Sequence, residues 1–408
     1  MERFYIYLRM GSSHTIFNRY KSTFMKSIFN YSLTASAILL SFNAFSSGLF
    51  LQEAVVANAG TTGAGDGVYT ESAAAMWVNP ATMSYMGENK TTINTMAFDL
   101  EMKFNDQNGS ADGKAHSILP SAGAFHAQKI TDKLHVGLAL GAIGGSSLDY
   151  GSEWAGSHLL EDISLTAMQV NPALSYKVND QLSLGAGLQL SWASFEQSMG
   201  GGITAEQDSD WAYGYNLGAM YQASEKLSVG LSYRSKLEHV FKNDLARIDQ
   251  QLSSEMIMPD IIDISSSYAL NKDLNLLTSI QFHRWSHWDS TVLSVNSNLP
   301  SVEIQRDWDD VWKFAIGTNY RLNSDWRLKA GFSYETSPQD DPSLQWVDLP
   351  VGEQYRYSVG ASTSWDDITM DMFYEYADLG SVDMNRPNVK VNGTFDGRIH
   401  FVGVNFTF

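Results

Sequence analysis

Four basic side chains stand in stretches where apolar and polar residues alternate, and each falls on the polar face: Lys313, Arg327, Lys329 and Arg356. An ammonium or guanidinium group beside apolar surface can hold the carboxylate of a ligand through charge-assisted hydrogen bonds. Each cation could instead pair with a carboxylate of the chain itself, such as Asp371 or Glu375. The sequence therefore offers cations for an anionic group and leaves open which of them have protein partners.

No other residue pattern points to catalysis or to a metal site. His283 and His287 lie four residues apart, and in an extended strand they would share a face but stand about 13 Å apart along it. That is poor spacing for two ligands of one metal, so we predict ordinary polar side chains. The chain has no cysteine and lacks the G-x-S-x-G pattern of a serine hydrolase. We therefore expect no enzyme, no cofactor and no bound metal.

Charge and the N-terminus define the broad class of the protein. The formal net charge of −18 argues against nucleic acid as a partner, because a nucleic-acid-binding surface is basic. An export signal is indicated by Lys26, an apolar run over 28–45, and the small-x-small sequence Ala44-Phe45-Ser46. We expect residues 1–46 to be an upstream extension plus a cleaved signal peptide, with the mature chain starting near Ser47. A single transmembrane anchor is the alternative, although the run is only marginally long enough to span.

Beyond Ser47 no run of about 20 apolar residues occurs, yet 44% of all residues are hydrophobic and 12% aromatic. Period-two alternation is clear over 274–288, 326–334 and 368–376, and the apolar face often begins or ends with Tyr or Trp. Strands of a soluble sandwich also alternate, but they are usually about five or six residues long. Runs of 9 to 15 residues have the length that a tilted strand needs to cross a bilayer.

Turns alternate between short and long, which is typical of outer-membrane barrels. Short polar turns include 131–132 and 323–324, and long loops include 290–307, 337–352 and 379–396. We predict an all-β fold, a 14-stranded antiparallel transmembrane barrel with both termini in the periplasm. Its strands are expected at 91–105, 117–129, 133–146, 163–178, 181–196, 210–223, 226–240, 259–270, 274–289, 308–322, 325–336, 353–365, 368–378 and 397–408. Pro172 lacks a backbone N–H, so it marks a bulge in the fourth strand or displaces that strand.

Strand direction then assigns the four cations to the two ends of the lumen. The tenth and twelfth strands run from the outer side toward the periplasm, so Lys313 and Arg356 face the lumen near the outer end. A ligand would arrive at that end, and these two residues are the predicted ligand cations. Arg327 and Lys329 face the lumen near the periplasmic end.

The segment 47–83 is rich in Gly, Ala and Thr, includes Asn79-Pro80-Ala81, and shows little strand periodicity. A non-strand segment ahead of a barrel can be accommodated in the lumen. We therefore divide the mature chain into an N-terminal hatch or plug at 47–85, with Asn79, Pro80 and Ala81 as its motif, and a barrel at 86–408. A barrel closed by its own N-terminus is a gated transporter rather than an open pore.

The chain ends in an alternating run in which Val402, Val404, Phe406 and Phe408 share the lipid-facing side. A terminal Phe408 on an alternating last strand resembles the signal that is read by outer-membrane assembly machinery. An ordinary soluble strand that ends in Phe by chance is the alternative. Outer-membrane lipid and lipopolysaccharide are the other expected partners of such a barrel.

The mature chain resembles the FadL/TodX family of outer-membrane transporters for long-chain fatty acids and other hydrophobic compounds. The resemblance rests on Gly48-Leu49 through Gln52-Glu53, Asn79-Pro80-Ala81, Met258-Pro259-Asp260, Trp285-Ser286, the block 308–338, Pro350 and 355–360. The N-P-A sequence alone would be weak evidence. Its position after this N-terminus, together with the long block, makes the resemblance specific.

The resemblance implies a barrel that is plugged by an N-terminal hatch. Substrate would be captured outside, held in a hydrophobic pocket, and released sideways into the membrane through a gap at a kinked third strand. In this sequence the lateral-opening region falls at Gly141, Gly144 and Gly145, because glycine accepts conformations that interrupt a strand ladder. These glycines could instead give room to the plug.

Leu49 takes the place of a hatch residue that reaches the pocket, and Phe50 and Leu51 are its neighbours. All three are predicted to contact ligand, with packing against the barrel wall as the alternative.

One departure from the family lies in the outer loops. The loop 197–210 is short and glycine-rich, whereas 241–258 is longer and is predicted to be partly helical from the spacing of its apolar residues. We therefore expect an outer capture site of different shape.

The expected function is passive transport of hydrophobic molecules, most of all long-chain fatty acids, across a bacterial outer membrane. A transporter of aromatic or alkane hydrocarbons, a general porin with an open lumen, and a barrel that serves only as an adhesin or structural element remain as alternatives. The driving force would be differential affinity and partition into lipid, because the sequence contains no motif for using ATP.

Overall fold

A computed structural model describes residues 53–246, 250–295, 302–350 and 352–408. The predicted extension and signal peptide, and Leu49, Phe50 and Leu51, lie outside the described residues. In the described part of the chain, no helix has the length and apolar character needed to cross a membrane.

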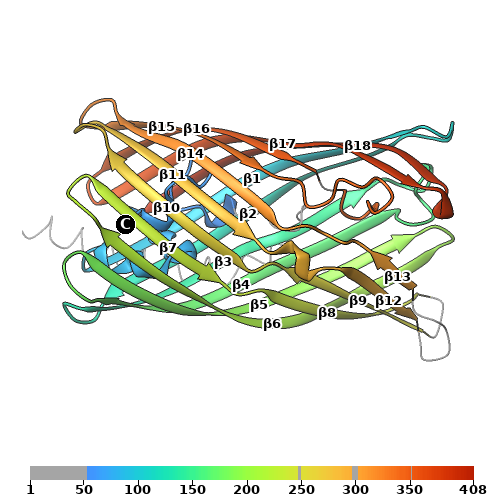
Figure 1. Ribbon diagram of the computed structural model, residues 1–408, viewed down its shortest axis with the longest axis horizontal. Helices are drawn as coiled ribbons and strands as arrows, with labels where there is room; N and C mark the ends of the chain where they lie inside the picture. Colours follow the sequence, from blue (N-terminus) through green and yellow to red (C-terminus); the bar gives the residue numbers. More distant parts are fainter. Residues whose placement is uncertain (1–52, 247–249, 296–301, 351) are drawn as a thin grey trace, which may run out of the picture. The chain divides into compact units, whose positions relative to one another are not determined.

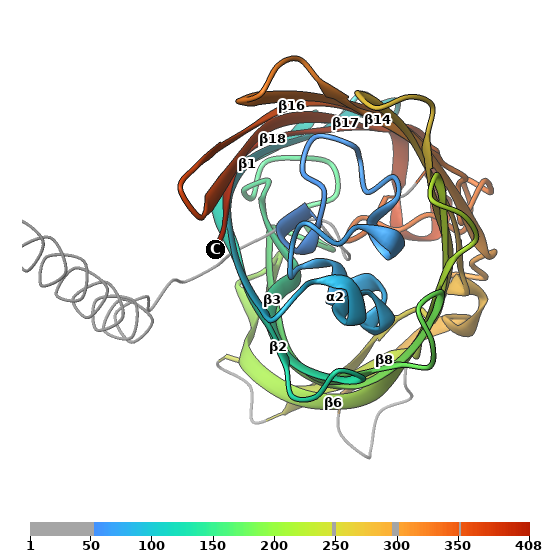
Figure 2. The same cartoon turned by 90° about the vertical axis from the view of Figure 1, so that its left-hand side faces the viewer.

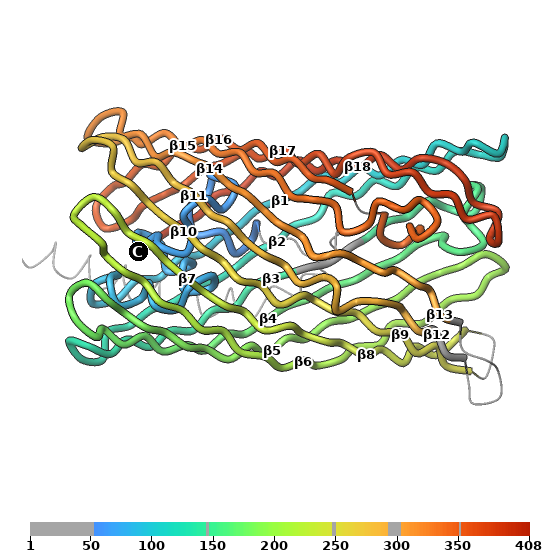
Figure 3. Tube along the Cα trace, viewed as in Figure 1, coloured from blue at the N-terminus to red at the C-terminus, as the bar shows by residue number. Residues whose placement is uncertain are grey.

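Fourteen antiparallel strands close into one barrel (Figures 1 and 3). This result confirms the prediction of an all-β, 14-stranded antiparallel barrel. The barrel strands are β1 (Asn89–Asp106), β2 (Gly113–Lys129), β3 (Leu134–Asp149), β4 (Asp162–Lys177), β5 (Leu182–Met199), β6 (Ile203–Gln222), β7 (Leu227–Arg234), β10 (Ile261–Ala269), β11 (Leu274–His283), β14 (Val311–Arg321), β15 (Trp326–Glu335), β16 (Gln354–Trp365), β17 (Ile368–Arg386) and β18 (Val391–Thr407). The closure pairs β18 with β1, from Thr92–Thr407 to Asp106–Gly393, and so leaves no free strand edge at this point of the wall.

The outer surface of the wall carries the apolar band that a membrane requires. Side chains such as Leu217, Leu231, Ile264, Ile316 and Val359 are exposed on the outside of the strands. Exposed aromatic side chains bound this band near the short turns, at Tyr176, Tyr221, Tyr268, Tyr320, Trp326 and Trp365, and toward the other end, at Trp211, Tyr213, Trp312 and Tyr357. Two aromatic belts around an apolar band are typical of a barrel that spans an outer membrane.

Several elements beyond this band differ from the predictions. Residues 241–258 were expected to be partly helical, but they belong to the hairpin of β8 (Leu237–Asp244) and β9 (Gln251–Met258). With β12 (Ser290–Val295) and β13 (Val302–Gln305), these strands form a four-stranded sheet. The helix prediction is wrong because burial along β8 alternates residue by residue, and this period-two pattern decides the local structure.

Two predicted loops and one predicted strand also have different bounds in the structure. The predicted loop 379–396 is mostly strand, because β17 and β18 continue beyond the membrane band and are joined at η5 (Pro387–Val389). The loop 197–210 is reduced to a turn at 200–202 between β5 and β6. The predicted strand 274–289 ends at His283 and is followed by the 3-10 turn η4 (Trp285–His287), so His283 and His287 do not share a strand face.

Pro172 lies inside β4, where it pairs with Leu138 of β3. On the other side of β4, pairing with β5 stops after Val170–Leu190 and resumes at Ala173–Gly187 without a change of register. The missing N–H of proline accounts for the interruption. The side chain of Asn171 partly replaces it by donating a hydrogen bond to the Leu188 carbonyl at 2.7 Å.

Candidate functional site

Residues 53–88, here called the N-terminal segment, lie inside the barrel toward the end with the short turns (Figures 1 and 2). They form short elements only: η1 (Glu53–Val55), η2 (Asp66–Val68), α2 (Ala75–Val78) and η3 (Pro80–Tyr85). The Asp66 carboxylate folds the chain back on itself by accepting hydrogen bonds from the amides of Ala57 (2.9 Å) and Asn58 (3.1 Å). Most side chains of the segment are buried, although few of them are large.

The Asn79-Pro80-Ala81 sequence joins this segment to three neighbouring strands. The Asn79 amide donates to the carbonyls of Gly67 (2.8 Å) and Ala219 (3.0 Å), and its oxygen accepts from the Ala81 amide (3.0 Å). The Ala81 carbonyl accepts hydrogen bonds from the Ser175 hydroxyl (3.2 Å) and the Ser183 hydroxyl (2.8 Å). Pro80 begins η3, where its missing N–H costs nothing. The motif therefore holds the segment against β4, β5 and β6.

Glycines on the inner wall allow the segment to approach closely. A Cβ at Gly185 would lie 2.6 Å from the Pro80 carbonyl carbon, and one at Gly360 would lie 3.1 Å from the Gly60 Cα. The same crowding against the segment is found at Gly123, Gly137, Gly141, Gly218, Gly230, Gly317 and Gly331. Glycine at these positions leaves a lumen whose inner surface is complementary to the segment.

Ion pairs also link the segment to the wall. Arg356 of β16 pairs with Glu53 and lies 3.8 Å from Glu375 of β17. Arg327 of β15 pairs with Glu71. Arg356 and its two carboxylate partners are almost completely buried, so removal of Arg356 would leave two buried carboxylates without their arginine partner.

The predicted ligand cations Lys313 and Arg356 are brought to the same region of the lumen. Lys313 lines a narrow cavity whose other walls include Glu53, Asp66, Gln281 and Glu375. Both cations therefore lie among carboxylates of the chain, as the alternative interpretation of the sequence allowed. Lys329 is similarly paired with Asp371.

The third strand has an irregularity at the predicted opening. The β3–β4 register shifts between Ala142 and Gly144, which leaves Ile143 as the extra residue. Pairing of β2 with β3 runs only from Lys129–His135 to Gly123–Gly141, although both strands continue beyond it. Gly141 also gives room to the segment, because a Cβ there would meet Val55. The seam between β2 and β3 is thus unpaired from Gly141 outward.

An apolar cluster leads from the outer end of the barrel to this seam. Trp285, Trp288 and Trp308 pack together, with ring centroids of Trp285–Trp308 and Trp288–Trp308 each 5.1 Å apart. The cluster continues through side chains of β8 and β9 to the N-terminal segment and β3; its members include Leu237, Phe241, Met256, Met258, Trp77 and Ile143. Such a cluster offers apolar partners to a ligand with a long or bulky hydrophobic part.

Arg234 is a lumen cation that the sequence analysis missed. It ends β7, and its guanidinium donates to the Gln189 side-chain oxygen (2.5 Å) and to the Trp77 carbonyl, while lying 4.7 Å from the Trp77 ring centroid. The ion pairs of the described residues do not include Arg234. Strand alternation alone could have found it, because its neighbour Tyr233 faces outward while Arg234 is buried.

The described residues contain no cluster of three or more His, Cys, Asp or Glu side chains that could hold a metal ion.

A sequence profile for the family described as outer membrane protein transport protein (OMPP1/FadL/TodX) matches residues 37–408. The chain belongs to this family. As an OMPP1/FadL/TodX protein, it is an outer-membrane transport protein, and both the predicted family and the predicted location are confirmed.

Relatives of this OMPP1/FadL/TodX protein agree with the assignment. The chain is 21% identical to the long-chain fatty acid transport protein of Escherichia coli K12, over 94% of this chain and 99% of the relative. The structure of a Pseudomonas aeruginosa FadL homologue superposes with a TM-score of 0.80 at 19% identity, covering 89% of this chain and 99% of that chain. The Pseudomonas putida toluene transporter TodX gives a TM-score of 0.69 at 15% identity, covering 86% and 98%.

Proposed function

We propose that this protein carries hydrophobic molecules, long-chain fatty acids above all, passively across the outer membrane and releases them sideways between β2 and β3. The observation that carries the proposal is the unpaired seam beyond Gly123–Gly141, next to the extra residue Ile143 of β3. Ile143 belongs to the apolar cluster that starts at the outer tryptophans. A hydrophobic molecule following this cluster would reach the wall at the point where backbone pairing is lost.

In this proposal residues 47–85 are a hatch inside a barrel formed by 86–408, and residues 1–46 are removed on export. The ties at Asn79-Pro80-Ala81 and the pair Glu53–Arg356 keep the hatch in the lumen. Gly141, Gly144 and Gly145 form the region of lateral opening. A segment that fits the inner wall this closely argues against a general porin with an open lumen.

Long-chain fatty acids are proposed as the substrate because the apolar cluster is long and cations lie beside the lumen. Lys313 and Arg356 remain candidate ligand cations, and Leu49, Phe50 and Leu51, which precede Glu53, are candidate ligand contacts. Aromatic hydrocarbons are the second candidate. They are favoured by the packed rings of Trp285, Trp288 and Trp308 at the outer end of the cluster.

A disulfide that fixes the hatch to the wall tests the proposal. The hydroxyl oxygens of Ser84 in η3 and Ser175 in β4 lie 2.7 Å apart, and the chain has no other cysteine to interfere. The double variant Ser84→Cys/Ser175→Cys is expected to lose oleate uptake when oxidised and to recover it on reduction. Ser266→Cys/Thr278→Cys is the matched control, because it joins two wall strands whose hydroxyls are 2.8 Å apart. Full uptake by the oxidised Ser84–Ser175 variant would contradict movement of the hatch.

Two further partners are proposed from the barrel itself. Phe408 continues the pairing of β18 with β1, since its backbone exchanges hydrogen bonds with Thr91 at 3.1 Å and 2.8 Å. We propose that this terminal strand is presented to outer-membrane assembly machinery, and that the finished wall is surrounded by outer-membrane lipid and lipopolysaccharide. Assembly at a normal rate after deletion of Phe408 would argue against the first of these, and an unchanged melting temperature in lipopolysaccharide-free bilayers would argue against a specific contact with that lipid.

A further inference from the structure

A second interruption of the barrel wall lies between β6 and β8. Pairing of β6 with β7 runs outward to Asn216–Arg234, although β6 continues to Ile203. Beyond Arg234 the neighbour of β6 is β8, which belongs to the separate four-stranded sheet (Figure 1). Across the described residues, these two strands meet in one isolated bridge, Ala205–Leu245. We call this stretch, 205–215 against 235–245, the β6–β8 seam; on its other side β6 stays paired with β5 as far as Ile203.

Side chains bridge the β6–β8 seam in place of a backbone ladder. The Val240 amide donates a hydrogen bond to the Asp210 carboxylate at 2.9 Å, and the Lys242 amide donates one to the Asp208 carboxylate at 2.7 Å. Asp208 and Asp210 are here called the seam carboxylates. In a ladder the backbones lie about 4.8 Å apart, and a side chain placed between them holds them farther apart. Rotation of two side chains would therefore free this part of β8 from β6.

Hydrogen bonds to backbone carbonyls fix both ends of the seam. At the inner end the Ser235 amide donates to the Tyr215 carbonyl at 2.9 Å. At the outer end the Ala246 amide donates to the Thr204 carbonyl at 2.8 Å, and the Asn243 side chain donates to a carbonyl of β6 at 2.8 Å. The stretch between these ends is held by the seam carboxylates.

Apolar and aromatic side chains stand on both sides of the seam. Trp211, Tyr213 and Tyr215 are exposed on the outer surface of β6, at the belt nearer the long loops. Ala212 of β6 and Phe241 of β8 are buried, and both belong to the apolar cluster described above. A hydrophobic molecule among the lipids beside these rings would therefore need to pass only one layer of the wall to reach the cluster.

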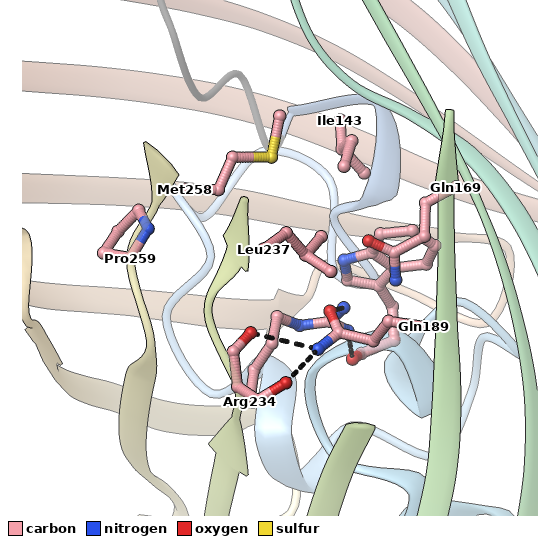
Figure 4. A pocket seen from close by; sticks show the side chains of 9 residues that line it. Ile143, Gln169, Gln189, Arg234, Leu237, Met258 and Pro259 are labelled. Carbon is pink, nitrogen blue, oxygen red and sulfur yellow. Dashed lines mark hydrogen bonds between the residues drawn. The ribbon is translucent and has the colours of Figure 1, made fainter. Parts of the chain in front are cut away.

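The apolar cluster continues from the seam to β3. Leu237, the first residue of β8, lines a narrow cavity together with Met258 and Ile143 (Figure 4). Ile143 is the extra residue of β3 next to the unpaired seam between β2 and β3. The two interruptions of the wall are thus connected through one set of apolar side chains.

Charges along the β6–β8 seam indicate which molecules could pass. The outer part of β6 contributes three carboxylates to the seam: Glu206, Asp208 and Asp210. On the facing strand Lys242 is a cation, whereas Lys236 is paired with Glu238 at 3.2 Å. The excess of negative charge repels an anionic headgroup and leaves an uncharged one unaffected.

We propose that the β6–β8 seam is an entrance through which uncharged hydrophobic molecules dissolved in the outer leaflet reach the apolar cluster. It opens when the amides of Val240 and Lys242 leave the seam carboxylates, while β6 stays paired with β5 and β8 stays paired with β9. The proposal rests on the transport of hydrophobic molecules proposed above and adds a way into the lumen from the membrane.

A disulfide at the outer end of the seam tests this entrance. Ala205 and Leu245 are a non-hydrogen-bonded antiparallel pair, in which side chains lie close together. The intact variant Ala205→Cys/Leu245→Cys is placed in bilayers that contain lipopolysaccharide, with a diazirine-bearing 1-hexadecanol as the probe. Photolabelling of Phe241 and Met256, which are buried behind the seam, is measured by mass spectrometry. It is expected to fall about tenfold on oxidation and to recover on reduction.

Ser266→Cys/Thr278→Cys is the matched control, because it joins two strands away from the seam and should leave the labelling unchanged. Asp208→Ala/Asp210→Ala removes both acceptors and should increase labelling of Phe241 about tenfold. Asp208→Asn/Asp210→Asn keeps an oxygen acceptor for each amide and should give a smaller increase. The sulfate ester of the probe alcohol, which is anionic, should label Phe241 less than the alcohol does.

Labelling of Phe241 that is insensitive to oxidation would overturn the entrance, because the probe would then arrive by another path, while the proposed transport would stand. If the cysteine variant does not assemble, unchanged labelling in Asp208→Ala/Asp210→Ala would overturn it equally. Equal labelling by the sulfate would overturn the selection for uncharged molecules. If the alcohol labels neither Phe241 nor Ile143 in the wild-type protein, the proposed transport itself is refuted.

Discussion

The close fit between the wall glycines and the N-terminal segment can be tested with a single methyl group. A Cβ at Gly185 would lie 2.6 Å from the Pro80 carbonyl carbon, whereas ordinary contacts begin at 3.4 Å. The segment must therefore shift by at least about 0.8 Å in Gly185→Ala, because the Pro80 carbonyl carbon and the still closer Ala81 nitrogen are backbone atoms. Such a shift acts directly on the Ala81 carbonyl, which accepts from Ser175 and Ser183.

The expected cost follows from overpacking and from those hydrogen bonds. Overpacking costs roughly 1–3 kcal/mol, and each weakened hydrogen bond contributes about 1 kcal/mol. With two such bonds, a combined loss of about 3–5 kcal/mol would raise the population of the undocked segment roughly 150- to 4,000-fold. Hydrogen-exchange mass spectrometry of peptides covering 75–86 measures this population, and exchange there should accelerate by the same factor.

Gly137→Ala is the control for this substitution. A Cβ at Gly137 would approach the Met83 Sδ to 2.5 Å and the Met76 methyl carbon to 2.6 Å, so the overlap is similar, but it falls on the ends of two flexible side chains. Exchange over 75–86 should change less than about threefold, since a methionine rotamer can adjust at a cost of roughly 0.5 kcal/mol. Equal exchange in the two variants would refute the argument that backbone contact at Pro80 holds the segment.

Two further substitutions probe the charges around the segment. Arg356→Met leaves Glu53 and Glu375 buried without their arginine partner and should lower the free energy of unfolding in urea by roughly 3–5 kcal/mol. Adding Glu53→Gln should recover part of this loss, and no recovery would mean that Arg356 does not balance the charge of Glu53. Burial raises the pKa of Asp66 from 3.8 to about 6, against the opposing effect of the Ala57 and Asn58 amides, and Asp263 and Lys313 are the charged neighbours. Because the folded pKa is the higher one, the stabilising contribution of Asp66 is complete below about pH 4 and is lost as pH rises through 6, a change of about 3 kcal/mol. Proteolysis of the segment should thus be slower at pH 5 than at pH 8, and Asp66→Asn should remove the difference.

The parts of the strands that lie within the apolar outer band are predictable from the sequence. Within this band, one face of each strand is apolar along its whole length. Beyond the band the faces exchange roles: Phe104 and Phe395 point inward and are buried, whereas Lys103 and Arg398 are about half exposed. Strand ends that are predicted only from apolar residues on the lipid side therefore fall too early, and the predicted loop 379–396 is mostly strand for this reason. The hairpin β8–β9 was missed for a related reason, since short apolar runs there fit both helical and strand spacing.

The site was less predictable than the fold. Alternation correctly assigned Arg356 to the lumen, but its partner Glu53 lies 303 residues away in the sequence, and only closure of the barrel brings them together. The predicted strand 226–240 runs through Arg234, whereas β7 ends at this residue. The partner of a buried cation can come from any part of the barrel wall or of the N-terminal segment. The alternation within a single strand therefore does not show whether the cation has a counter-charge.

The glycine-lined inner wall has a consequence for how the barrel is assembled. The first and last strands must meet across the full length of the chain, as the bond between Thr92 and Thr407, 315 residues apart, illustrates. The N-terminal segment touches early strands at Gly123 and Gly137 and late strands at Gly331 and Gly360. By binding both halves, it shortens the loop that remains to be closed and lowers the entropic cost of joining β18 to β1. We therefore expect a chain without this segment to meet a larger entropic cost when β18 joins β1.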